Sequence, residues 1–156
     1  MKRISGSLLR NPLALFLVFP LAIPTASALA GEYDMALKNV DGVKAVFNVS
    51  LGSPAVANAV FWAVGNAYRD EAVRKLPKKP EVAVVFHGKA VKLLTIDKAG
   101  FDKKEHGEID KFQATLREMK KEGVTFEVCM YAVKVIGLDP TTVMPEIDKV
   151  GKASSR

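Results

Sequence analysis

The stretch Glu81-Val-Ala-Val-Val-Phe-His-Gly88 decides the fold class of this chain of 156 residues. A run of five apolar residues, rich in valine, predicts a strand that is covered on both faces, which is typical of parallel sheets. The dipeptide His87-Gly88 ends this strand. Two other segments have strand character, residues 43–49 upstream and residues 124–128 downstream. We therefore expect a sheet of at least three strands.

Helical patterns separate these three segments. Ser53-Pro54 is typical of a helix start, and the apolar spacing that follows predicts one helix up to Pro77. Asp102 and Glu105 form a capping-box pattern before an amphipathic segment that ends at Gly123. Residues 91–96 predict a short helix or a loop. Strands that alternate with helices predict an α/β fold, a single-domain parallel-sheet sandwich with helices on both faces.

The last part of the chain predicts two more helices. Residues 130–136 can form two helical turns that stop at Gly137. Asp139-Pro140 is typical of a helix start, and we expect this helix to run to about Val150. Residues 151–156 form a polar tail.

Composition excludes several classes of protein. The chain is 49% hydrophobic and 26% charged, with a single cysteine, so it is not a collagen, a disulfide-stapled miniprotein or a disordered tail. Its net charge is +6. Three basic residues lie in the first ten, which leaves 20 Lys plus Arg against 17 Asp plus Glu. Without a basic stripe, nucleic acid is not an expected partner.

The N-terminus has the three parts of a signal peptide. A basic segment up to Arg10 precedes an apolar run over residues 13–23, and Ala28-Leu-Ala30 offers small residues for cleavage. A membrane anchor would need roughly 20 continuous apolar residues, and Pro20 interrupts this run. We expect cleavage after Ala30, a mature domain over residues 31–150 in the periplasm or outside the cell, and no membrane attachment after cleavage.

Three side chains that could take part in catalysis or binding follow the predicted strands. In parallel sheets ligands gather outside the carboxyl ends of the strands, where Ser50, His87 and Cys129 would lie together. A thiolate at Cys129 would be a nucleophile stabilised by the amides of the next helix. His87 could orient or deprotonate the thiol, or hydrogen-bond the backbone at its turn.

Other interpretations of these side chains stay open. Free cysteine is among the most buried residue types, so Cys129 could be a small core residue. A metal site from His87, His106 and Cys129 has no recognisable ligand spacing, and we expect none.

The order of these motifs resembles the DsrE/DsrF-like family. The similarity rests on residues 43–50, on Val84-Val-Phe-His-Gly88 followed by Val91-Lys-Leu-Leu94, and on Phe126-Glu-Val-Cys129 followed by Gly137-Leu138. It spans residues 43–150. Similar proteins continue beyond this region into a further hydrophobic strand. One alternative is therefore that the final strand of the sheet is absent from this chain.

The resemblance implies a sulfur relay. It implies that Cys129 accepts sulfane sulfur as a persulfide and passes it on, in the manner of a sulfur carrier or sulfurtransferase, without a metal or organic cofactor. Together with the positions at the strand ends, this leads us to predict Cys129 and His87 as catalytic residues and Ser50 and Met130 as substrate-binding residues. Expected partners are sulfur donor and acceptor proteins or small sulfane-sulfur compounds, in a homo-oligomer. The alternatives are an oligomeric small-ligand-binding module in which Cys129 is buried, and a thiol redox switch.

Overall fold

The structure is a computed structural model that describes residues 34–98 and 100–151. The predicted signal peptide lies outside the described residues, as does most of the polar tail. The elements in chain order are α1 (Asp34–Leu37), β1 (Lys44–Val49), α2 (Pro54–Arg69), α3 (Glu71–Arg74), β2 (Glu81–Phe86), the 3-10 helix η1 (Gly88–Leu94), η2 (Lys103–Glu105), α4 (His106–Lys121), β3 (Thr125–Cys129), α5 (Met130–Ile136), η3 (Pro140–Thr142) and β4 (Asp148–Val150).

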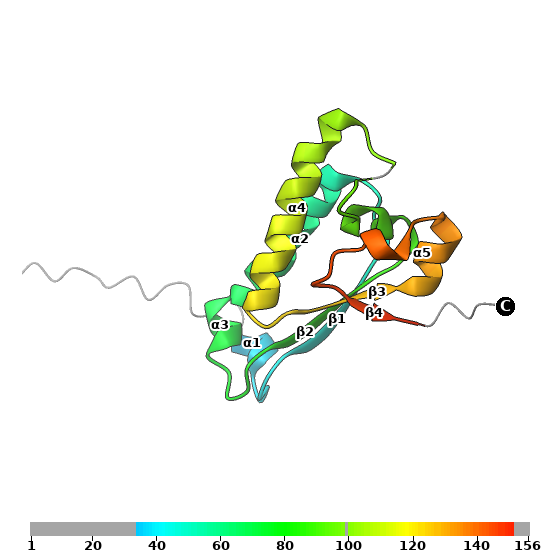
Figure 1. The fold of residues 1–156 in the computed structure, drawn as a ribbon. Helices are drawn as coiled ribbons and strands as arrows, with labels where there is room; N and C mark the ends of the chain where they lie inside the picture. The colour runs from blue at the N-terminus through cyan, green and yellow to red at the C-terminus, as the bar shows by residue number, and fades with distance from the viewer. Residues whose placement is uncertain (1–33, 99, 152–156) are drawn as a thin grey trace, which may run out of the picture.

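The four strands form one parallel sheet in the order β1-β2-β3-β4. The α/β class and the parallel sheet are confirmed. Every connection between strands advances in the same direction across the sheet, and right-handed crossovers that do so all lie on one face. Accordingly α2 packs beside α4, while η1 packs against α4 and α5 (Figure 1). The long helices therefore cover one face of the sheet rather than both.

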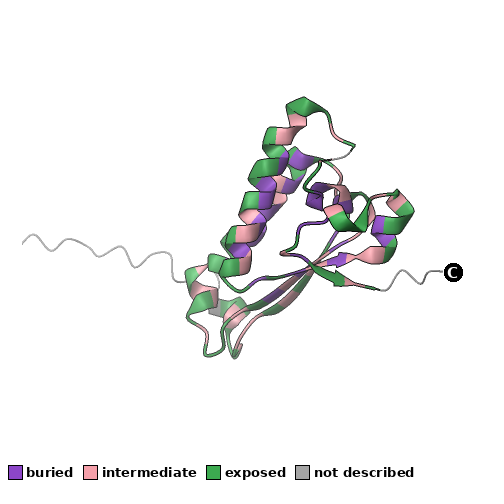
Figure 2. Cartoon of the chain, viewed as in Figure 1, coloured by how far each residue is buried: buried purple, intermediate pink, exposed green. Residues whose placement is uncertain are grey.

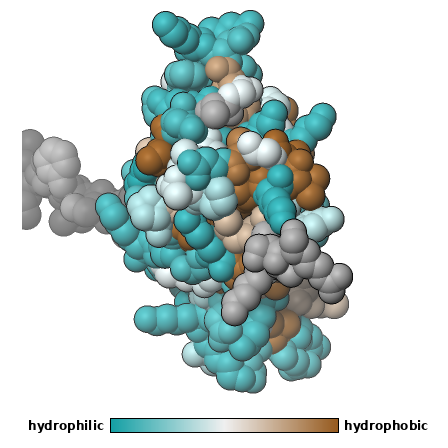
Figure 3. Space-filling model, turned by 45° about the vertical axis from the view of Figure 1, so that its right-hand side comes forward, coloured by the Kyte–Doolittle hydropathy of each residue, from teal (hydrophilic) through white to brown (hydrophobic). Residues whose placement is uncertain are grey.

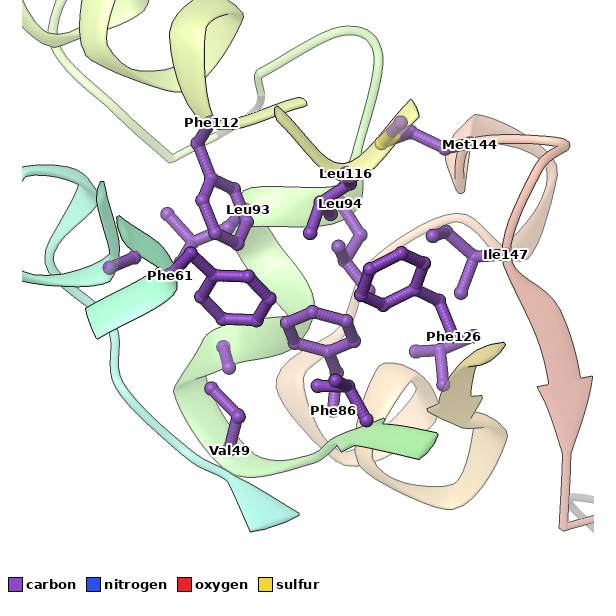
Figure 4. Close-up of a cluster of buried hydrophobic side chains, with 14 of the residues drawn as sticks. Val49, Phe61, Phe86, Leu93, Leu94, Phe112, Leu116, Phe126, Met144 and Ile147 are labelled. Carbon is purple, nitrogen blue, oxygen red and sulfur yellow. The ribbon is translucent and has the colours of Figure 1, made fainter. Parts of the chain in front are cut away.

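The core lies between this helical layer and the sheet. Phe61 of α2 stacks on Phe86 of β2 with ring centroids 5.7 Å apart, and it makes a T-shaped contact with Phe112 of α4, with ring centroids 4.9 Å apart (Figure 4). Figure 2 shows the buried residues on the sides of the helices that face the sheet. Along β2, buried residues alternate with half-buried ones, because successive side chains point to opposite faces.

Two predicted helices differ from the structure. The helix from Pro54 ends at Arg69, because Asp70 adopts an extended ψ of 132° and its side chain accepts hydrogen bonds from the amides of Ala72 and Val73. These two bonds start the separate short helix α3.

The helix predicted from Asp139 is wrong beyond its first turn. Only η3 forms there, and residues 148–150 are a strand. Pro145 explains the difference, since proline disfavours the helical conformation of the residue before it. The final strand is therefore present but only three residues long.

The segment before β4 is anchored on α4. Arg117 Nε donates to Glu146 Oε1 over 2.8 Å, and the ammonium group of Lys120 donates to the carbonyl of Glu146. The Arg117 guanidinium holds the pKa of the Glu146 carboxyl below its usual range, against the opposing effect of partial burial. These contacts fix the chain that leads from η3 into β4.

Candidate functional site

The structure places the three predicted residues side by side along the carboxyl ends of β1, β2 and β3. β1 and β2 are in register at Val49 and Phe86, and β2 and β3 at Phe86 and Val128. His87 and Cys129 each come one residue after the Phe86–Val128 pair. The N–H of His87 donates to the carbonyl of Val49 over 2.9 Å, which extends the β1–β2 ladder past Phe86.

His87 and Cys129 line one shallow hollow of about 310 Å³. Its lining residues are His87, Gly88, Cys129, Tyr131, Ala132, Val135 and Ile136. Figure 3, in which the side of the molecule that carries α5 is turned forward, shows apolar surface in this region. Side chains of α5 therefore give the hollow a mostly apolar wall.

Tyr131 and Val135 were not predicted as site residues. They lie one turn apart on α5 and are 66% and 64% exposed. A large apolar pair at a spacing of four residues was visible in the sequence, but it resembles the pattern of a core-facing helix. Only the fold shows that this pair faces outward beside the cysteine.

Cys129 joins β3 to α5 and is partly exposed. Strand alternation directs the Cys129 side chain away from the face that carries Phe126 and Val128, although Cys129, like Met130, is partly buried and packs against the core. The side chain makes no hydrogen bond to the first amides of α5, which is only seven residues long. Partial exposure leaves the thiol within reach of a reagent or a partner, which a fully covered core cysteine would not be.

The two predicted substrate-binding residues lie outside the hollow. Ser50 is exposed at the end of β1, and its Cβ lies 3.5 Å from the place that a Cβ on Gly88 would occupy. Met130 is partly buried and packs against the core. A role of Ser50 or Met130 in substrate binding stays a prediction, and the geometry brings together only Cys129 and His87.

Two other features of the described residues bear on the site. His106, at the start of α4, has its Nε2 3.4 Å from the carbonyl of Phe101. In the part of the chain that the structure describes, no three histidine, cysteine or acidic side chains come together in a way that could hold a metal. A larger hollow of about 580 Å³ lies between α2 and α4 beside Trp62, and neither Cys129 nor His87 lines it. The larger hollow is therefore separate from the cysteine.

Comparisons with known proteins agree with this architecture. The model of the DsrE/DsrF-like family matches residues 44–154. A solved structure of a protein of unknown function from Methanobacterium thermoautotrophicum is similar, with a TM-score of 0.52 and 18% sequence identity over 69% of this chain and 81% of that chain. At this identity the likeness shows the fold alone. No curated protein matches the sequence. Within the described residues no helix is both long and apolar enough to cross a bilayer.

Proposed function

Because this chain belongs to the DsrE/DsrF-like family, which is associated with sulfur relay, we propose that it carries sulfane sulfur as a persulfide on Cys129. One observation supports this proposal above the others. The only cysteine of the chain is partly exposed at the carboxyl end of β3, in a hollow that it shares with His87. Nucleophilic sulfur chemistry requires an accessible thiolate, and a neighbouring imidazole is a suitable group to assist it.

The proposed transfer needs no oxidant or cofactor. The Cys129 thiolate attacks the outer sulfur of a donor persulfide, R–S–SH. The new bond joins this sulfur to Sγ, the donor S–S bond breaks, and R–S⁻ leaves, which yields Cys129–S–SH. An acceptor thiolate then attacks the outer sulfur in the same way and releases the Cys129 thiolate. His87 would assist by taking up the thiol proton before the first attack.

The apolar wall of the hollow bears on the choice of donor and acceptor. Apart from His87 and Cys129, the side chains of the hollow offer little polar surface to orient a small charged sulfur compound. Tyr131 and Val135 instead provide exposed apolar surface of the kind found where proteins meet. Among the expected partners we therefore favour donor and acceptor proteins over small sulfane-sulfur compounds.

Intact-protein mass tests the proposal. The protein is incubated with polysulfide beside a Cys129→Ser control, and each is then treated with excess thiol. We expect the unaltered protein to gain the mass of one sulfur atom, to lose it with thiol, and the control to gain none. If folded protein gains no sulfur while unfolded protein reacts normally with a thiol reagent, Cys129 is a core residue and the proposal fails. A covalent dimer under oxidant, without sulfur gain, would identify a redox switch instead.

We further propose that the protein is exported, from the signal-peptide pattern of its first thirty residues. The mass and N-terminal sequence of the protein recovered from its host test this. A mature chain that begins at Gly31 is the expected result, and a chain that retains residues 1–30 would contradict it.

A further inference from the structure

β1 forms an unpaired edge of the sheet. The carbonyls of Val43 and Val49 accept hydrogen bonds of 2.9 Å from the amides of Glu81 and His87, so the odd-numbered residues of this strand face β2. Backbone groups alternate in direction along a strand, so Lys44, Val46 and Asn48 point their N–H and C=O groups away from the sheet. Within the described residues no second strand pairs with this side of β1.

β1 is also less covered than its neighbour on both faces. On the helical face, Ala45 and Phe47 are only partly buried, whereas the corresponding residues Val82 and Val84 of β2 are buried. On the opposite face, Val46 is 72% exposed. Apolar side chains therefore flank the free backbone groups on both sides of the sheet.

Features that protect natural edge strands from pairing are missing from β1. Such edges usually carry a proline, a bulge or outward charges, or are very short. β1 has six residues, no proline and one charge, at its first position. That charge is engaged with the sheet, because Lys44 Nζ lies 2.8 Å from Glu81 Oε2 on β2.

From these observations we propose that β1 pairs antiparallel with β1 of a second copy of this chain, across a two-fold axis at Val46. An axis normal to the sheet keeps each side chain on its own face, so opposed residues must belong to the same face. Val46 then lies opposite its own copy, Lys44 opposite Asn48, and Ala45 opposite Phe47. The outward backbone groups of the even-numbered residues meet each other and complete a ladder.

The register favours a second copy as the occupant. An isologous interface requires a self-complementary surface. In this register the apolar Val46 meets itself and the apolar Ala45 meets Phe47, while the two Lys44 ammonium groups lie at opposite ends of the paired segment. Shifting the axis to Phe47 would set Val46 against the polar Asn48. The axis at Val46 therefore gives the better match of apolar with apolar side chains on the face opposite the helices.

Disulfide cross-linking between engineered cysteines tests this register directly. Val46→Cys in a Cys129→Ser background is compared with the matched Asn48→Cys variant, which changes the next exposed residue on the same face of β1. Opposed Cα atoms of a backbone-bonded antiparallel pair are about 5.5 Å apart, within disulfide range. Two copies of residue 48 would be separated by about four residues along the strands, roughly 13 Å. With mild oxidant at micromolar protein, we expect at least fivefold more covalent dimer from V46C than from N48C.

Equal cross-linking of both variants, or none in either, would overturn the proposed pairing. A second measurement does not depend on new cysteines. By sedimentation the protein, in the form that its host produces, should be a dimer, and Val46→Lys should be a monomer with an unchanged far-UV circular dichroism spectrum. The control Val56→Lys places the same charge on a half-exposed residue of α2 and should remain a dimer. A monomeric native protein, or a V46K variant that stays dimeric, also overturns the proposal.

The result of these pairing tests does not depend on whether the protein carries sulfur. Cys129 lies on β3, two strands away from β1, and is replaced by serine in the cross-linking variants. A protein that gains no sulfur could still pair through β1, and a monomer could still carry a persulfide.

Discussion

Cys129 and His87 each lie one residue beyond the register pair Phe86–Val128, and both line the same hollow at the carboxyl ends of β2 and β3. Parallel register therefore brings together two residues that are 42 positions apart in the sequence. The backbone fixes both positions. His87 is held by the hydrogen bond from its amide to the Val49 carbonyl, and Cys129 is the last residue of β3. The backbone of two neighbouring strands therefore determines where the thiol and the imidazole lie.

His87 should assist sulfur uptake by Cys129 without being required for folding. We expect His87→Ala to lower the rate of sulfur gain from polysulfide by about a hundredfold, the low end of the range for loss of acid–base assistance. The rate is followed by intact mass against time. The matched control is His106→Ala, which removes the second histidine of the chain, far from the hollow in sequence, and should leave the rate unchanged. Equal rates for H87A and the unaltered protein would remove His87 from the mechanism.

The contact between Arg117 and Glu146 should make part of the stability depend on pH. Folding lowers the pKa of Glu146, so the contact stabilises the protein above the ordinary glutamate pKa, and this stabilisation is lost as pH falls through the lower folded value. Both side chains are more than a third exposed, which limits the contribution to about 0.5 kcal/mol. Glu146→Gln should lower the free energy of unfolding in urea by this amount at pH 7, with the difference shrinking below about pH 4.

The control for this measurement is Glu71→Gln. Glu71 pairs with Lys75 across one helical turn, and both side chains are at least 72% exposed. Such a pair contributes little to stability, so the variant should have the same free energy of unfolding as the unaltered protein at pH 7 and at pH 3. A difference between E146Q and the unaltered protein that persists undiminished at pH 3 would show that the carboxylate charge is not its cause.

Local patterns predicted much of this fold. The apolar runs that end at Phe86 and Val128 are strands, and the capping box of Asp102 and Glu105 precedes α4 as expected. Gly123 follows α4 as predicted, with a φ of 106° that favours glycine. In each case a short segment contains the signal that determines its structure. The placement of His87 and Cys129 at one sheet edge followed from the same strands and from parallel topology.

The remaining features depend on distant partners. β4 is a strand because Asp148 and its neighbours pair with β3. A segment of three residues is too short to show the alternating pattern that would predict a strand. One-sided coverage of the sheet follows from strand order, and valine-rich strands do not reveal which face a helix covers. The wall of the hollow likewise depends on where α5 lies relative to His87 at the end of β2. Tyr131 and Val135 therefore became visible as site residues only in the structure.

Phe61 should be among the most costly core residues to truncate. Its ring is 1% exposed and contacts both Phe86 and Phe112. Phe61→Ala removes these contacts and leaves a cavity, so we expect a loss of about 3–5 kcal/mol in the free energy of unfolding measured with urea. The control Val56→Ala shortens a half-exposed residue of the same helix and should cost about 0.5 kcal/mol at most. A loss below about 1 kcal/mol for F61A would mean that the core repacks around the missing ring.

Two glycines should respond to alanine with opposite signs. Gly137 ends α5 in the left-handed conformation with a φ of 76°, whereas Gly107 lies within α4. A Cβ at either position would meet no atom within 4 Å, so neither substitution creates a clash. Gly137→Ala should therefore cost about 1 kcal/mol from backbone strain alone, while Gly107→Ala should stabilise the fold by up to about 1 kcal/mol from helix propensity. Urea unfolding of both variants measures the contrast. If G137A is as stable as the unaltered protein, the end of α5 can adopt another conformation, and the wall of the hollow beside Cys129 is less fixed than the structure indicates.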